Sequence, residues 1–545
     1  MVTIGGFDVL IRNAKIVDGT GNPWFYGDIA INKDRIVEIA PPGHIAVEAA
    51  REVVEAAGLV ASPGFIDILS HSHVPLMYDP RDLSKITQGV TTEILGEGWT
   101  PAPGGGRIQD PFQDLSGQSR ALISEWVEAA KGWTRFRDWL DALVKRGISP
   151  NVGSFLGGGT LREYVKGLDM GEPSSDEIAT MQRVMADAME DGALGVSYAL
   201  IYPPDTYTST EELIEVAKVA SSYGGIYVTH MRSEGQYLLE AIDETIEIGR
   251  RAELPVEIYH LKASGRASWH KMPAAIERIQ AARDSGVDIT ADMYPYPGSG
   301  TGLDSILPTW VAEGGRYFET LADPKVQERI RTEVLSSPQA PETLAHGLGP
   351  EDVMPIGFEQ PENLQYAGKR LSEIADLRGQ HWLDAVITLL LSERQRIFTV
   401  YFSMDEANVA LGLRQPWVKI STDAGGVDPA WARDQGPTHP RAYGTYPRVL
   451  AKYVREEKLL TLEDAIRKMS GSVATRLGLR DRGFLRPGCY ADIVLFDERV
   501  VADRATFSDP HQLSVGMRDV WVNGTRVIQN GQHIGATPGQ IVTRD

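Results

Sequence analysis

Two histidines separated by one serine, His71 and His73, follow a short apolar run in the segment GFIDILSHSH. Successive side chains of a strand alternate between its two faces, so we expect both imidazoles on the same side. Neutral imidazole is the commonest protein ligand for metal ions, and a same-side pair can hold one ion. The motif is short, however, and two of the chain's 11 histidines can also fall close together by chance.

Further residues of metal-ligand type stand where other apolar runs end. Glu97 follows the run in TTEILGEG, His230 the run in GGIYVTHMRSEG, and His260 the run in LPVEIYHLKASG. Asp423 closes the last run, VKISTDAGG. Each residue alone has an ordinary explanation as a core histidine, a solvated loop carboxylate or a helix cap. Together, four histidines and two carboxylates at the ends of five strands predict a site for one or two divalent ions.

The elements that must position these residues alternate in type along the chain. Eight apolar runs, from FIDILSH to VKISTDAGG, each break into glycine, proline or polar residues. Amphipathic stretches such as STEELIEVAKVASSY and KMPAAIERIQAARDSG lie between several of them. This alternation predicts an α/β fold with a (β/α)8 TIM-type barrel. The chemistry of such barrels sits at the carboxyl ends of the strands, which is where the candidate ligands stand.

The two ends of the chain have a different pattern. DVLIRNAKIVDG near the start and GCYADIVLFD near the end are typical of short strands, and NG pairs suit tight hairpins. We expect residues 1–60 and 483–545 to form a small β-sandwich domain and residues 61–482 to form the barrel. A partly helical stretch, about 298–417, follows the seventh barrel strand. We expect it to be an inserted subdomain over the barrel mouth.

Composition narrows the classes of partner. The net charge of -20 and the pI near 5.1 argue against a nucleic-acid binder and against adhesion to an anionic membrane. No apolar run is long enough to span a membrane, and the first residues do not have the pattern of a signal peptide. The single cysteine, Cys489, excludes an intrachain disulfide framework. We expect a cytoplasmic protein that acts on a small molecule, with a homo-oligomer left open.

Longer motifs of the chain resemble those of the N-acyl-D-amino-acid deacylases, or D-aminoacylases, of the amidohydrolase superfamily. They run over nearly the whole chain, from PGFIDILSHSH through ITQGVTTEILGEG, SYALIYPPDTY, YVTHMRSEG and STDAGG to HPRAYGTYPRVL. The resemblance implies a metal-bearing barrel, a β-sandwich built from both chain ends and an insertion after the seventh strand. It also implies an enzyme that hydrolyses amides.

The resemblance assigns roles to single positions. Asp423 matches the catalytic acid/base of the family, Lys262 and Arg441 fall where the family holds the substrate carboxylate, and Tyr294 matches a pocket tyrosine. The residues that match the family's histidine ligands are His71, His73, His230 and His260.

One position departs from the family pattern. Where these deacylases carry a metal-binding cysteine in a GNCG-like turn, this chain reads GEGW, with Glu97 or Gly98 in its place. Cys489 is too distant in the sequence to substitute without a large rearrangement. Either Glu97 takes over as ligand or the metal site differs. Since a carboxylate can bridge two ions, we expect one or two Zn²⁺ ions, with other divalent metals open.

Three functions stay open at this point. The first is hydrolysis of a linear amide, in an N-acyl-D-amino acid or a D-configured peptide, by metal-activated hydroxide with Asp423 as acid/base. The second is opening of a cyclic amide, as in dihydroorotase- or hydantoinase-like enzymes, and the third is a non-catalytic barrel. Lys262 and Arg441 favour the first, because two cations near the metal predict a substrate with a free carboxylate. Arg441 could instead brace the segment that follows it.

Overall fold

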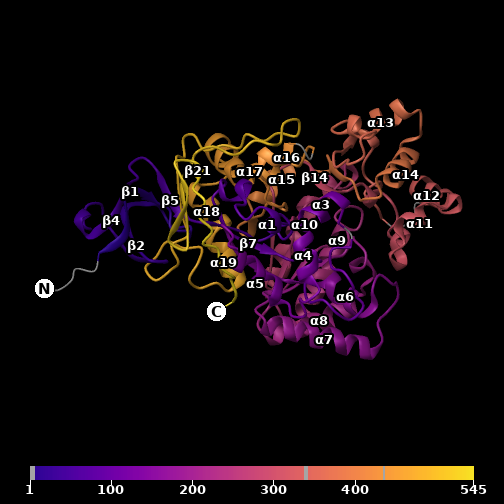
Figure 1. Cartoon of the computed structure of the whole chain (residues 1–545), viewed down its shortest axis with the longest axis horizontal. Coiled ribbons are helices and arrows are strands. Elements are labelled where there is room, and N and C mark those ends of the chain that lie inside the picture. Colours follow the sequence, from indigo (N-terminus) through magenta and orange to yellow (C-terminus); the bar gives the residue numbers. More distant parts are fainter. Residues whose placement is uncertain (1–5, 114, 337–341, 434–435, 545) are drawn as a thin grey trace.

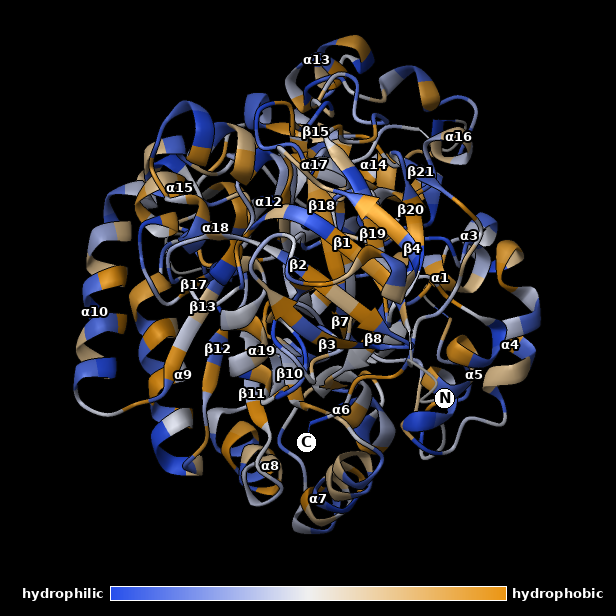
Figure 2. Cartoon of the chain, turned by 90° about the vertical axis from the view of Figure 1, so that its left-hand side faces the viewer, coloured by the Kyte–Doolittle hydropathy of each residue, from blue (hydrophilic) through white to orange (hydrophobic). Residues whose placement is uncertain are grey.

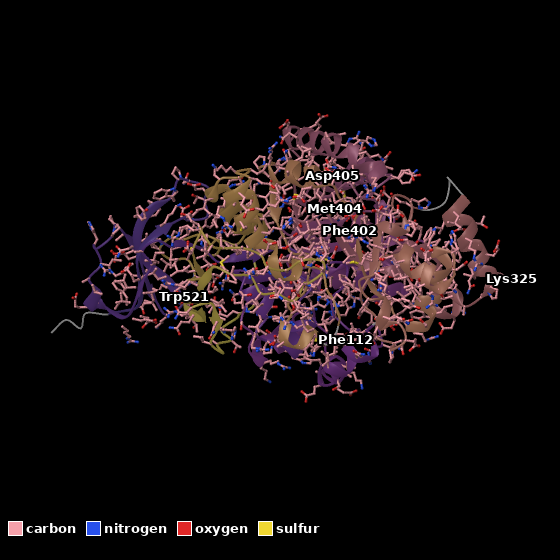
Figure 3. All side chains as sticks on the ribbon, turned by 90° about the horizontal axis from the view of Figure 1, so that it is seen from above. Phe112, Lys325, Phe402, Met404, Asp405 and Trp521 are labelled. Atoms are coloured by element: carbon pink, nitrogen blue, oxygen red, sulfur yellow. The ribbon has the colours of Figure 1, made fainter. Side chains whose placement is uncertain are left out.

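The computed structural model describes residues 6–113, 115–336, 342–433 and 436–544. Three parts follow one another along the long axis in Figure 1: a β-sheet region, a central α/β region and a mainly helical region at the far end. Trp521 of the sheet region and Lys325 of the helical region lie toward opposite ends of the molecule (Figure 3). The candidate ligands belong to the central region.

Both ends of the chain contribute to one nine-stranded sheet, in which β5 pairs with β1 from the N-terminal side and with β18 from the C-terminal side. Ile11, Ile29, Ile493 and Trp521 are buried in one core, so neither chain end completes it alone. Figure 2 looks onto this end and shows apolar residues recurring along the strands. The strands are β1 (Phe7–Ile16), β2 (Phe25–Asn32), β3 (Arg35–Ala40), β4 (Ala50–Glu55), β5 (Val60–Pro63), β18 (Ile493–Phe496), β19 (Met517–Val522), β20 (Thr525–Gln529) and β21 (Gln532–His533).

In the described residues, the strands of the central region form one sheet of three strands and one of six, and within each sheet they pair in parallel and in chain order. They are β6 (Phe65–Asp67), β7 (Val90–Leu95), β8 (Asn151–Ser154), β9 (Leu156–Gly157), β10 (Gly195–Ala199), β11 (Ile226–His230), β12 (Val256–Ile258), β13 (Ile289–Met293) and β17 (Val418–Ile420). Beyond the last strand the chain returns to the first, since the Asp423 N–H donates to the Leu69 carbonyl at 3.0 Å and the His71 N–H to the Ala424 carbonyl at 3.1 Å. These bonds bring Asp423 beside His71.

Helices connect successive strands, and the two that the sequence predicts over 209–223 and 271–286 are confirmed as α8 and α10. In α8 the Ser209 side chain caps the N-terminus, and the buried residues Leu213, Ala217 and Ala220 recur at helical spacing. No described helix combines the length and apolar character that crossing a membrane requires. The helices of this region are α1 (Pro75–Tyr78), α2 (Leu83–Ile86), α3 (Gly117–Leu122), α4 (Ser124–Ala130), α5 (Arg137–Arg146), α6 (Gly158–Lys166), α7 (Ser175–Glu190), α8 (Thr210–Ser222), α9 (Leu238–Ala252), α10 (Met272–Asp284), α15 (Glu406–Leu413), α16 (Pro429–Ala432), α17 (Arg441–Arg448), α18 (Leu462–Met469) and α19 (Gly471–Leu477).

Between β13 and α15 the chain forms an antiparallel sheet of β14 (Ser299–Gly302), β16 (Phe398–Tyr401) and β15 (Val353–Pro355), together with α-helices. The helices are α11 (Tyr317–Leu321), α12 (Pro324–Ser336), α13 (Leu371–Arg378) and α14 (Trp382–Glu393), of which α12 and α14 confirm predicted helices. This part has its own hydrophobic core, with members from Leu303 to Tyr401. Val409 and Leu413 of α15 belong instead to the larger core of the central region.

Candidate metal centre

Glu97 lies among three histidines at the carboxyl ends of the parallel strands. Its Oε1 is 3.3 Å from His230 Nδ1 and 3.2 Å from His260 Nε2, and its Oε2 is 3.0 Å from His71 Nε2. The flanking Gly96, at φ 101°, has a backbone conformation that favours glycine, and a Cβ there would lie 2.3 Å from the Phe155 carbonyl oxygen. The tight turn after β7 therefore presents the carboxylate to imidazoles from three different strand ends.

Asp423 completes a second group that shares Glu97 with the first. Its Oδ1 is 2.9 Å from His71 Nε2. Within the described residues, Glu97, His230 and His260 offer ligand atoms that all lie within 4.8 Å of one another, and so do His71, Glu97 and Asp423. Two groups that could each hold a divalent ion, with Glu97 common to both, therefore lie at the strand ends.

His73 belongs to neither group. The expectation of a strand through His73 is wrong, because β6 ends at Asp67 and His73 lies in a turn, where side chains do not alternate. Its ring centroid is 6.3 Å from that of His71 and 4.9 Å from that of Trp99. Its Nδ1 is buried without a hydrogen-bond partner, and burial lowers the pKa of His73 to about 3. The ring is therefore neutral, as a ligand must be, and its role as a ligand stays a prediction.

Glu234 is a residue of the site that the sequence analysis does not include. Its Oε1 lies 3.0 Å from His260 Nδ1 and 2.5 Å from Lys262 Nζ, and Lys262 Nζ lies 2.7 Å from the same imidazole nitrogen. A partner on Nδ1 orients the ring so that Nε2 faces Glu97. Glu234 stands in the loop four residues after His230, so inspection of strand ends alone passes over it. The sequence signal that could have identified Glu234 was the presence of an acidic residue shortly after the candidate ligand His230.

Arg441 faces the centre rather than the segment that follows it. One of its terminal nitrogens, Nη1, is 2.7 Å from Asp423 Oδ2, and the guanidinium lies 4.7 Å from the centre of the Tyr294 ring. The side chain is 4% exposed. Arg441 Nε and the Tyr294 hydroxyl are both buried without a hydrogen-bond partner. Two polar groups capable of donating hydrogen bonds are thus available beside the carboxylate that is predicted to act as acid/base.

The charges of the centre favour a cation between ionised carboxylates. Although burial disfavours its charged form, hydrogen bonds to Asp423 and Glu97 raise the pKa of His71 to about 9. Burial also opposes ionisation of Asp423, but Arg441 lowers the pKa of that carboxyl to about 2. Hydrogen bonds from the surrounding histidines likewise outweigh burial and hold the pKa of Glu97 well below its usual range. Positive charge is therefore stabilised at the point where the ligand atoms meet, as binding of a divalent ion requires.

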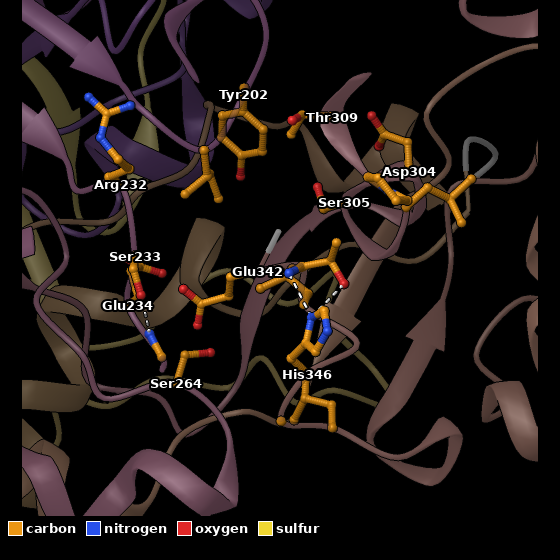
Figure 4. A pocket seen from close by; sticks show the side chains of 18 of the residues that line it. Tyr202, Arg232, Ser233, Glu234, Ser264, Asp304, Ser305, Thr309, Glu342 and His346 are labelled. Carbon is orange, nitrogen blue, oxygen red and sulfur yellow. Dashed lines mark hydrogen bonds between the residues drawn. The ribbon is translucent and has the colours of Figure 1, made fainter. Parts of the chain in front are cut away.

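A cavity of about 580 Å³ opens onto both ligand groups and is also lined by Lys262, Tyr294 and Arg441. Arg396, from the part of the chain between β13 and β17, also lines it and forms an ion pair with Asp304 at 2.9 Å. A smaller cavity of about 90 Å³ adjoins it (Figure 4), and Tyr202 and Glu234 border both.

The donor set fits zinc. Imidazole nitrogens and carboxylate oxygens are ligands that zinc takes in proteins, and five residues with such atoms meet here. His230 Nε2 is buried without a hydrogen-bond partner, 3.8 Å from Glu234 Oε2, whereas Nδ1 of the same ring faces Glu97. The arrangement can hold one or two ions beside a carboxylate that can move a proton.

Comparison with known proteins agrees with this chemistry. Residues 409–528 match the Amidohydrolase family. The chain is 34% identical to a D-aminoacylase of Alcaligenes xylosoxydans xylosoxydans, over 99% of this chain and 98% of the relative. It superimposes with a TM-score of 0.80 on a crystal structure of D-aminoacylase, at 32% identity, covering 99% of this chain and all of the other (100%). With N-acyl-D-glutamate deacylase from Bordetella bronchiseptica, solved in complex with zinc and a phosphonate mimic of the tetrahedral intermediate, the TM-score is 0.79 at 28% identity, covering 99% of this chain and 100% of that one.

Proposed function

Because this chain belongs to the D-aminoacylase family of amidohydrolases, the N-acyl-D-amino-acid deacylases, we propose that it removes the acyl group from N-acyl-D-amino acids by metal-dependent hydrolysis of a linear amide. One observation carries the proposal. The two ligand groups that share Glu97 and the cations of Lys262 and Arg441 line the same cavity. An amide and a neighbouring carboxylate can therefore be bound together.

Zinc is the ion that we propose. Glu97, His230 and His260 would hold one ion, and His71, Asp423 and the shared Glu97 would hold a second. His73 stays a predicted ligand outside both groups. When bound, zinc lowers the pKa of water to roughly 7 and polarises a carbonyl group. Glu234 would keep His260 oriented through its Nδ1.

Asp423 is the proposed proton carrier. Its carboxylate is ionised at neutral pH, because Arg441 outweighs the effect of burial on its pKa, and so it can accept a proton from water. The ion pair with Arg441 occupies Oδ2, whereas Oδ1 faces His71 and the centre. The same oxygen can then give the proton to the amine nitrogen as the amide bond breaks.

The free carboxylate of the substrate is the proposed ligand of Arg441, Lys262 and Tyr294. The unpartnered Nε of Arg441 and the unpartnered hydroxyl of Tyr294 can donate hydrogen bonds to it, and Lys262 adds a point charge. A preference for the D configuration is supported by the relatives, which are named for D-amino acids.

The architecture is part of the same proposal. We infer that the central strands close into the (β/α)8 barrel formed by residues 61–482, and that residues 1–60 and 483–545 form the β-sandwich domain. The parallel order of the strands and the hydrogen bonds from Asp423 and His71 across the last and first strands support closure. The inserted subdomain is assigned to about 298–417, with its separate core at 303–401. The single cysteine, Cys489, is free and buried, which supports a cytoplasmic location.

A substrate panel tests the function. The purified protein would be assayed with N-acetyl-D-amino acids, their L enantiomers, D-configured dipeptides and hydantoins, before and after removal of metal by a strong chelator. We expect hydrolysis of N-acetyl-D-amino acids that is lost with the metal and restored by Zn²⁺. Turnover of hydantoins alone, or hydrolysis that survives complete removal of metal, would contradict the proposal.

A further inference from the structure

A cavity of about 400 Å³ adjoins the metal centre. It shares His71 and Glu97 with the 580 Å³ cavity, but neither Lys262 nor Arg441 lines it. We call it the Trp99 cavity. A substrate with its carboxylate on the two cations and its amide carbon beside Glu97 has its acyl end pointing away from the cations, toward this cavity.

The walls of the Trp99 cavity are largely aromatic and aliphatic. They include Trp99, Phe112, Leu168, Tyr202 and Pro203. The Trp99 ring lies 4.9 Å from the His73 ring and 5.9 Å from the Phe112 ring, between centroids. Such a surface gains free energy by burying apolar groups and offers ring faces to an aromatic ligand.

Two carboxyl groups on the wall accept hydrogen bonds from the protein, although Asp205 Oδ1 is buried without a partner. Arg396 on the same wall forms its ion pair with Asp304 at 2.9 Å. Asp205 Oδ2 accepts a hydrogen bond from the Ala199 N–H at 2.6 Å, and burial raises the pKa of Asp205 to about 8. Glu163 accepts a hydrogen bond from Gln113 at 2.9 Å. Asp205 is therefore largely uncharged at neutral pH, so the cavity does not require a cationic ligand.

The backbone of Trp99 is held firmly, two residues from Glu97. A Cβ at Gly157 would lie 2.5 Å from the Trp99 Cα, so the two chain segments touch directly. The next residue, Thr100, donates its N–H to the Thr160 hydroxyl at 2.8 Å. The indole is thus carried by the same turn that presents Glu97, which links the shape of the cavity to the position of the centre.

We propose that the Trp99 cavity binds the acyl group of the substrate, and that this enzyme prefers apolar acyl groups larger than acetyl, including aromatic ones. This inference rests on the proposed deacylase function. The volume of about 400 Å³ is within the range of pockets that enclose whole small ligands, and an acetyl group would leave most of it unfilled. Burial of each additional methylene is worth roughly a fourfold gain in kcat/KM.

The alternative binding place for the acyl group is the 90 Å³ cavity of Figure 4, whose lining includes the apolar residues Leu307, Ala312 and Leu348. It is less than a quarter as large as the Trp99 cavity. Glu234, with Lys262 beside it, lies on its boundary, so an acyl chain entering it would pass charged groups.

The test compares the N-acetyl, N-butyryl, N-hexanoyl and N-phenylacetyl derivatives of one D-amino acid with the full chain loaded with Zn²⁺. We expect kcat/KM to rise by roughly tenfold or more from acetyl to butyryl, because two methylenes are added. Leu168→Trp, which fills the Trp99 cavity, should lower the ratio of kcat/KM for phenylacetyl over acetyl by roughly tenfold or more. Ala312→Trp places the same side chain in the 90 Å³ cavity and should leave that ratio unchanged.

The outcomes separate the two proposals. If the wild type hydrolyses N-acetyl-D-amino acids at least as well as the larger derivatives, the acyl cavity is overturned and the deacylase function stands. If Ala312→Trp lowers the ratio and Leu168→Trp does not, the acyl group binds in the other cavity. If none of the derivatives is hydrolysed, the deacylase function fails as well. If Leu168→Trp does not fold, Phe112→Ala is the variant to measure. It enlarges the Trp99 cavity and should shift the best substrate toward the hexanoyl derivative. An unchanged order of substrates would overturn the proposal.

Discussion

Glu97 is common to the two ligand groups of the centre, because its two oxygens face different imidazoles. Oε1 contacts His230 and His260, and Oε2 contacts His71. A carboxylate in this position can join two ions. The sequence indicates this residue in two ways, as a carboxylate at the end of an apolar run and as the charged group nearest to the point where the resembling deacylases carry a cysteine. Its distances to the histidines depend on the turn at Gly96 and on strand pairing, neither of which is visible in the motif itself.

Glu97→Gln should reduce both bound zinc and activity. An amide keeps the size of the side chain but loses the negative charge and one acceptor oxygen. Mutation of a residue that only supports a metal ligand lowers metal affinity or activity by roughly 10–100-fold, so we expect kcat/KM to fall by more than this when the ligand itself is changed. Metal content per chain and kcat/KM are the measurements. Glu163→Gln, on the same cavity wall but outside both ligand groups, is the matched control. Unchanged metal content in Glu97→Gln would remove Glu97 from the ligands.

Asp423→Asn tests the proton carrier. Asparagine preserves the shape and the contact with Arg441 but cannot accept the proton, so kcat should fall by roughly 10²–10⁴-fold at saturating zinc. The thermal midpoint of unfolding, measured alongside, shows that the fold persists. A decrease of less than tenfold in kcat would assign the proton transfer to another group.

At the scale of elements, sequence patterns identified helices more reliably than the ends of strands. α8 has a serine cap and a regular apolar face, and both signals are local. The end of β6 depends on its pairing with β7 and on the bridge between Ser70 and Ala424, so the sequence extended the strand to His73 where the chain already turns. His260 also lies beyond the end of β12, at φ 34°, a left-handed conformation that an apolar run does not reveal. Glu234 was missed because it lies in a loop.

A buried lysine in α2 forms hydrogen bonds with residues at or near three strands of the centre, β6, β7 and β17. Lys85 of α2 donates hydrogen bonds to Asp67 at the end of β6 (2.7 Å), to Glu93 of β7 (3.0 Å) and to Thr422 after β17 (2.8 Å). The side chains of Lys85, Asp67 and Glu93 are all 0% exposed. The network lies directly below the chain segments that carry His71 and Asp423, so it positions both residues.

Lys85→Met should lower the free energy of unfolding by about 3–5 kcal/mol, because it leaves two buried carboxyl groups without their cation. Denaturant unfolding, with slope and midpoint determined separately, measures the change. Lys131→Met is the control: its ion pair with Glu128 is exposed, and such pairs contribute about 0–1 kcal/mol. If the two variants lose the same small amount, Lys85 does not hold the strand ends together.

At the scale of the whole molecule, the sequence indicated the broad plan because its signals are repeated many times. The alternation of strands and helices recurs through the central region, and strand-like segments at both chain ends meet in one sheet. The extent of the insertion was harder to predict. α15 is helical like its neighbours. It packs on the larger core of the central region and not on the core that ends at Tyr401, and only this packing distinguishes it from the helices of the insertion. Such packing preferences are not encoded in any one segment.

The central claim is that one cavity presents an amide to the metal centre while Arg441 and Lys262 hold the adjacent carboxylate. The most direct measurement is kcat/KM of the zinc-loaded wild type for an N-acetyl-D-amino acid and for the same compound with its carboxylate capped as an amide. We predict that capping weakens transition-state binding by about 1.5–3 kcal/mol, the value of hydrogen bonds to charged groups, which corresponds to roughly 10–150-fold in kcat/KM. Arg441→Ala should remove most of this discrimination. Equal kcat/KM of the wild type for the two compounds would contradict the account.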